Sequence, residues 1–137
     1  MMKFKLLLIS ALLVSLMLSK AYADNVVIIG HADLSKLSAS TIQRIFTGKV
    51  IEVDGVHVTA VNHKAGALRD RFLQHYLNQK NDNYTAYWTV RRFIGKGIPP
   101  RELSSAAEVI RFVQATPGAI GYIDENELKP DMNVISR

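Results

Sequence analysis

The chain has 137 residues, with 17 basic side chains, 12 acidic side chains and no cysteine. Its length fits one domain with one core. The lack of cysteine excludes a disulfide framework and a thiolate metal site. The net charge is +5. We do not predict a nucleic-acid partner, because binding nucleic acid needs a clustered basic face.

Residues 1–23 have the pattern of a secretory signal peptide. Lys3 and Lys5 precede an apolar run, and the small-residue end "AYA" stands before Asp24. The apolar run "LLLISALLVSLML" has 13 residues, whereas a helix that spans a bilayer needs about 20. We therefore expect cleavage after Ala23 and no membrane anchor afterwards.

Cleavage changes the charge and suggests a compartment. The signal segment holds three lysines and no acid, so residues 24–137 keep 14 basic against 12 acidic side chains, a charge of +2. The cysteine that a bacterial lipoprotein needs at its cleavage site is absent. We predict a single domain over 24–137, located in the periplasm; secretion further out stays open.

The first half of this domain predicts a strand, a helix and a hairpin. "NVVIIG" suits a buried strand. "SASTIQRIFTG" predicts a short helix, with Ser40 and Gln43 as a capping box and Gly48 in the left-handed position that ends it. "VIEVDGVHVTAV" predicts a hairpin that turns at Asp54 and Gly55 and ends at Val61.

The second half predicts three helices and two strands. An apolar stripe predicts the first helix, formed by Leu68, Phe72, Leu73, Tyr76 and Leu77. Asn83 is expected to cap the next helix. The core is expected to include five side chains of this helix: Tyr84, Tyr87, Trp88, Val90 and Phe93. Ser105 and Glu108 form a capping box for the last helix, and "GAIGYI" and "MNVISR" are the final strands. Alternating strands and helices predict an α/β domain, a small mixed sheet flanked by helices.

Four segments of the chain resemble the substrate-binding proteins of phosphate ABC transporters. They lie in the family's order between about Leu34 and Asp124: "LSASTIQRIFTGKV", "GVHVTAVNHKAGALRDRF", "AYWTVRRFIGKGIPP" and "VIRFVQATPGAIGYID". The resemblance implies a type 2 periplasmic-binding fold, of which the chain can supply one lobe. It is similar to the short, stand-alone members of the group.

The resemblance implies an anion site at the turn "KAGALR". The family binds phosphate there through the hydroxyls and N–H groups of "SGT" at a helix start, and those positions fall on Gly66, Ala67 and Leu68, without the hydroxyls. Backbone N–H groups and the helix dipole can still attract an anion. Lys64 and Arg69 would add charge, and Arg69 is expected at the surface because it lies off the apolar stripe.

No other constellation in the sequence predicts chemistry. His31, His57, His63 and His75 have no metal-ligand spacing, and no serine lies in a nucleophile elbow. We therefore expect no enzyme activity, no metal and no cofactor.

Two functions follow from the sequence. The first is a periplasmic solute-binding-like protein that holds phosphate or another oxyanion at residues 64–69. The alternative is an interaction module of the cell envelope that keeps only the fold. A single lobe exposes the surface that a second lobe would cover, so we expect a homodimer or an envelope protein partner through the face that bears Gly66.

Overall fold

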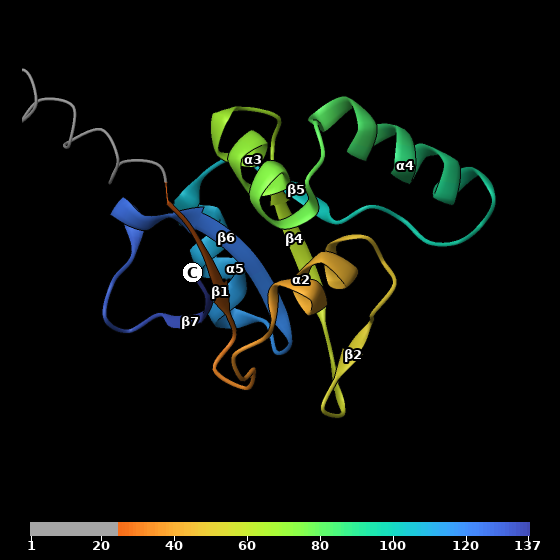
Figure 1. Cartoon of the computed structure of the whole chain (residues 1–137). Helices are drawn as coiled ribbons and strands as arrows, with labels where there is room; N and C mark the ends of the chain where they lie inside the picture. Colours follow the sequence, from red (N-terminus) through yellow and green to blue (C-terminus); the bar gives the residue numbers. More distant parts are fainter. Residues whose placement is uncertain (1–24) are drawn as a thin grey trace, which may run out of the picture.

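Five strands form one mixed sheet, in the order β5-β4-β6-β1-β7 (Figure 1). This computed structural model describes residues 25–137, and the predicted signal peptide lies outside them. β4 runs parallel to β5 and β6, whereas β1 is antiparallel to β6 and β7. The strands are β1 (Val26–Gly30), β4 (Thr59–His63), β5 (Arg101–Leu103), β6 (Ala119–Asp124) and β7 (Asn133–Ser136).

Helices cover both faces of the sheet, with α2 in front and α5 behind in the view of Figure 1. The helices are α2 (Ala39–Phe46), α3 (Ala67–Phe72), which continues as the π-helical turn η1 (Leu73–Leu77), α4 (Asn81–Phe93), α5 (Ala106–Ala115) and the 3₁₀ turn η2 (Glu125–Glu127). None of the helices within residues 25–137 combines the length and the apolar character needed to cross a bilayer.

The alternation of side chains along β1 divides the core into two layers. Ile28 packs with α2, α3, η1 and α4, whereas Val27 and Ile29 pack with α5. Every residue of β1 is buried, so the continuous apolar run of the sequence is explained by a strand that is covered on both faces.

Aromatic rings fill the layer under α2 and α3. Phe72 stacks on Tyr122 with 4.0 Å between ring centroids, and Phe46 lies 4.6 Å from Phe72. Burial of one such ring stabilises the fold by about 1.5–3 kcal/mol. On the opposite face, Gly121 allows α5 to approach the sheet, because a Cβ there would stand 2.8 Å from Val109.

A two-residue turn joins the predicted hairpin. Asp54 and Gly55 both have positive φ, as the turn between β2 (Glu52–Val53) and β3 (Val56–His57) requires. The hairpin is shorter than predicted, because the chain leaves it after His57 and enters the main sheet as β4. Gly48 ends α2 with φ 73°, which confirms its prediction.

Two predicted helix caps are wrong by two or three residues. Ser38, not Ser40, caps α2, and its hydroxyl accepts a hydrogen bond from the Thr41 amide. The cap of α4 is Lys80, so Asn83 lies inside the helix. In contrast, Ser105 caps α5 as predicted and accepts from the Glu108 amide.

One face of α4 is exposed where the sequence predicts core. Tyr84 and Trp88, four residues apart, are buried on one face of the helix. Val90 and Phe93 lie on other sides and are exposed, so their assignment to the core is wrong.

Candidate functional site

The turn that precedes α3 lies at the surface. Lys64, Gly66 and Ala67 are exposed, and Leu68 is half-buried against the front layer of the core. Gly66 is the N-cap of α3. Its backbone is extended, and no side chain caps the helix there. The helix that follows has only six residues, so its dipole is small.

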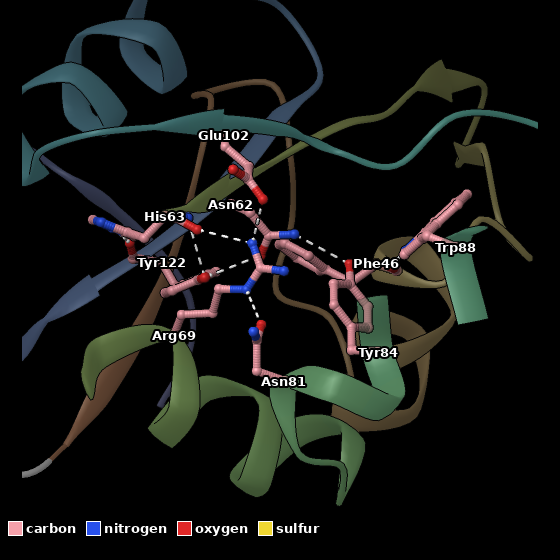
Figure 2. A network of polar contacts seen from close by, with 9 residues as sticks. All are labelled: Phe46, Asn62, His63, Arg69, Asn81, Tyr84, Trp88, Glu102 and Tyr122. Carbon is pink, nitrogen blue, oxygen red and sulfur yellow. Dashed lines mark hydrogen bonds and ion pairs between the residues drawn. The ribbon is translucent and has the colours of Figure 1, made fainter. Parts of the chain in front are cut away.

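Arg69, in contrast, lies in the interior, with 5% of its surface exposed. Its Nε donates to Asn81 Oδ1 at 2.8 Å, and its Nη1 donates to the His63 carbonyl at 3.1 Å. The same Nη1 lies 2.7 Å from Glu102 Oε1 (Figure 2). The expectation that Arg69 lies at the surface is therefore wrong: the side chain turns inward and links α3, α4, β4 and β5.

A chain of buried hydrogen bonds runs beside Arg69. The His63 amide donates to the Tyr122 hydroxyl, which donates to Asn62 Oδ1 at 3.0 Å. Asn62 Nδ2 donates to the Tyr84 hydroxyl, which donates to the Phe46 carbonyl at 2.7 Å. Figure 2 shows this chain crossing from β6 through β4 to α4 and α2. It locks the end of β4 to both neighbouring helices.

Burial keeps the network neutral apart from one ion pair. Burial lowers the pKa of His63, so its ring is neutral, and Nε2 donates to the Tyr122 carbonyl at 2.7 Å. Burial likewise raises the pKa of Tyr84 and of Tyr122, so both phenols keep their protons. The charges that remain are those of Arg69 and its half-exposed partner Glu102.

A pocket of about 130 Å³ opens beside this network. It is smaller than the roughly 300–1,000 Å³ of sites for drug-sized ligands. Ten residues from β4, α3, α4, β5 and the segment before β5 line it: Asn62, Arg69, Tyr84, Thr85, Trp88, Thr89, Arg92, Pro99, Pro100 and Glu102.

Several hydrogen-bond donors of the pocket are unused by residues 25–137. Arg69 Nη2 has no partner among them, and Figure 2 shows it on the side toward Tyr84. The side chain of the exposed Arg92 likewise makes no hydrogen bond or ion pair within that range. Of the two N–H groups of the Asn62 side chain, one donates to the Tyr84 hydroxyl, and the other has no acceptor within residues 25–137. Two guanidinium groups against one carboxylate, Glu102, leave the pocket with a net positive charge.

The structure separates the five residues that the sequence proposes as one site. Arg69 lines the pocket, whereas Lys64, Gly66, Ala67 and Leu68 do not. Sequence reasoning missed Asn62, Arg92 and Glu102. Parallel pairing of β4 with β5 places Asn62 opposite Glu102, and this register is a long-range feature that no local pattern in the sequence reveals.

The fold resembles one part of known phosphate-binding proteins. A protein of Clostridium perfringens, assigned as a phosphate ABC transporter substrate-binding protein and solved with bound phosphate, matches 83% of this chain with a TM-score of 0.63 and 20% identity. PstS of Borrelia burgdorferi matches 84% (TM-score 0.61, 16% identity), and an ABC-type phosphate transport receptor of Vibrio cholerae matches 83% (TM-score 0.56, 12% identity). No protein-family model and no curated protein sequence matches the chain.

The matches fix the fold class. The chain covers 45%, 47% and 46% of these three proteins, so it spans about half their length. Its mixed sheet with helices on both faces is a single lobe of a type 2 periplasmic-binding fold, as predicted. At identities of 12–20%, the likeness concerns the fold alone.

Proposed function

We propose that this chain is an exported, periplasmic solute-binding-like protein that holds phosphate or another small oxyanion in the pocket between Arg69 and Arg92. The observation that carries the proposal is the unused Nη2 of Arg69, a buried guanidinium whose other donors are all fixed. A guanidinium held this way is pre-oriented for an oxyanion, and charge-assisted hydrogen bonds are the strong ones.

The pocket suits a small anion in size and in charge. Its volume of about 130 Å³ admits an inorganic oxyanion with some water and excludes a nucleotide. Arg92 and Thr85, about two turns apart on α4, line the same space. Arg92 stands in solvent, so its contribution is screened by salt over about 10 Å at 0.1 M, and binding should be modest and salt-sensitive.

The exposed turn offers a second position for the anion. There the ligand would meet the amides of Gly66 to Leu68 and the Lys64 ammonium, without hydroxyls and without Arg69, which points inward. The pocket is favoured because its donors are partly buried, where an electrostatic contact is stronger than in water.

The test is a titration of residues 24–137 with phosphate and with sulfate. Trp88 is the only tryptophan of the chain and lines the pocket, so its fluorescence reports occupancy. We expect saturation at submillimolar to millimolar anion, and about a tenfold loss of affinity in Arg92→Ala, because one charge-assisted hydrogen bond contributes about 1.5–3 kcal/mol. Arg111→Ala, an exposed arginine on α5 outside this pocket, is the matched control.

Amide chemical shifts separate the two positions. An anion in the pocket shifts the amides of Thr85 to Arg92, whereas an anion at the turn shifts those of Gly66 to Leu68. If no amide shows a saturable change with either anion at millimolar concentration, the oxyanion proposal is wrong.

One observation favours a ligand-free interaction module as the second candidate. Glu102 lies 2.7 Å from Arg69, so the buried guanidinium already has a counter-charge without an anion. In that case the chain keeps the fold without a ligand, and the functional surface is an exposed face that binds another envelope protein or a second copy. Crosslinking in cells, followed by light scattering of the purified chain, tests this candidate directly.

A further inference from the structure

The end of α4 exposes apolar side chains that nothing else in residues 25–137 covers. We call Val90, Phe93, Ile94 and Ile98 the α4 tip. Phe93 is 92% exposed and Ile98 is 75% exposed. The first three follow helical spacing, i, i+3 and i+4, and so share one face of the helix. Large apolar side chains gathered at one exposed site mark an interaction surface.

Within the α4 tip, Phe93 projects from the molecule, whereas Ile98 borders a cavity of about 560 Å³ beside α2. Figure 1 shows the end of α4 and the following loop standing away from the sheet, at the margin of the molecule. A phenyl ring with 92% of its surface exposed is not lining a concave wall. A ring that projects in this way suits insertion into a soft surface better than it suits a flat contact with a partner protein.

Basic side chains surround the α4 tip. Residues 91–101, "RRFIGKGIPPR", hold four cations and no acid. Arg91 is committed to the Gly48 and Lys96 carbonyls and to the rings of Tyr87 and Trp88. The other three, Arg92, Lys96 and Arg101, are exposed. The nearest acid along the chain, Glu102, is already paired with Arg69.

This charge decides between the candidate occupants. A second copy joined through the same surface would place these cations against themselves, which opposes a symmetric dimer. Apolar side chains ringed by Lys and Arg are instead the pattern of a segment that rests in the interface of an anionic membrane. We propose that the α4 tip docks the protein reversibly onto an anionic phospholipid surface.

In this arrangement Phe93, Ile94 and Ile98 enter the boundary between headgroups and acyl chains. Lys96 and Arg101 lie at the level of the lipid phosphates. The apolar contacts of the proposal lie outside the anion pocket, since Val90 and Phe93 are on other sides of α4 than Tyr84 and Trp88, whereas Arg92 borders both regions. The binding should be peripheral, weakened by salt and dependent on acidic lipid.

Cosedimentation of residues 24–137 with vesicles tests the proposal. The wild type should bind vesicles that contain phosphatidylglycerol and should not bind phosphatidylcholine alone. The double variant Phe93→Ser/Ile98→Ser should lose affinity by about tenfold or more, because burial of each apolar side chain is lost. A thermal unfolding midpoint equal to that of the wild type shows that the variant is folded.

A matched pair of charge reversals tests the basic rim. Lys96→Glu should weaken vesicle binding several-fold, whereas Lys129→Glu, the same change on an exposed residue far along the chain, should not. Lack of wild-type binding to the acidic vesicles overturns the proposal, as does unchanged binding by the double variant. A stable dimer that Phe93→Ser dissociates would assign the α4 tip to a second copy instead.

Discussion

Helix α4 contributes to two regions that differ in the burial of their side chains. On one side, Tyr84 and Trp88 are buried and their polar atoms donate to the Phe46 carbonyl. On the other side, Val90 is 59% exposed and Phe93 is 92% exposed. The buried network has protein partners for most of its polar groups, so changes there should affect stability. The α4 tip is left incomplete, so changes there should affect binding and leave stability nearly unaltered.

The largest loss of stability is expected from Arg69→Ala. The change removes an ion pair and leaves the Asn81 side chain and the His63 carbonyl without their donor. We expect the free energy of unfolding to fall by about 2–4 kcal/mol, measured by urea denaturation. Arg92→Ala, next to the same pocket but exposed, should change it by less than about 0.5 kcal/mol. Equal effects of the two variants would contradict the division drawn between the regions.

Tyr122→Phe should have the next largest effect. The hydroxyl accepts from the His63 amide and donates to Asn62, so its loss leaves two buried polar groups unpaired. The expected cost is about 1–3 kcal/mol. The matched control is Tyr76→Phe, whose hydroxyl is partly buried and hydrogen-bonds, within residues 25–137, to Ser136 Oγ. A smaller cost for Tyr122→Phe than for Tyr76→Phe would mean that the chain of hydrogen bonds contributes little.

Stability should also depend on pH through His63. Its folded pKa is lowered by burial, whereas the unfolded chain has the ordinary pKa of about 6.5. As the pH falls below about 6.5, the unfolded state takes up a proton that the folded state does not, so the free energy of unfolding decreases. The decrease has a slope of at most about 1.4 kcal/mol per pH unit and ends below the folded pKa.

His63→Gln isolates this pH effect. Glutamine keeps an N–H donor for the Tyr122 carbonyl but does not titrate, so the slope between pH 7 and pH 5 should be shallower than in the wild type. His57→Gln, an exposed position on β3, is the control. Denaturant unfolding across this pH range provides the measurement, and identical slopes for His63→Gln and the wild type would exclude His63 as the cause.

The smallest change in stability is expected at the α4 tip. Phe93→Ser removes an exposed ring, so the free energy of unfolding should stay within about 0.5 kcal/mol of the wild type. Combined with Ile98→Ser in the double variant, this change is expected to weaken vesicle binding. A drop of 2 kcal/mol or more, about the size expected for a core residue, would show that Phe93 packs against the protein in solution.

The elements were predictable wherever local patterns decide them. The run "VVIIG", the Asp54–Gly55 turn and the cap Ser105 each act through their own neighbours, and the structure confirms all three. The position of Phe93 was not predictable in this way. An aromatic residue usually enters the core, and only the direction in which α4 leaves the sheet shows that this one does not.

The sequence predicted one residue of the site, Arg69, but not the arrangement of the residues around it. The resemblance pointed to Arg69, but the sequence could not show that Arg69 turns inward, because its partners Asn81 and Glu102 lie 12 and 33 residues away. Glu102 reaches it only through the parallel pairing of β4 with β5. Pairings between distant segments depend on the whole fold, and local periodicity carries no information about them.

The place of β1 in the sheet also sets the order in which the molecule can fold. β1 lies between β6 and β7, so the first strand of the domain pairs only with its last two, with Val26 opposite Asp124 and Gly30 opposite Asn133. Such contacts between distant parts of a chain form slowly, because a large loop must close first. A ribosome must therefore release the residues up to β7 before the centre of the sheet can assemble. Until then β1 has no partner strand, and a sheet that has not assembled leaves the polypeptide able to pass through a narrow translocation channel.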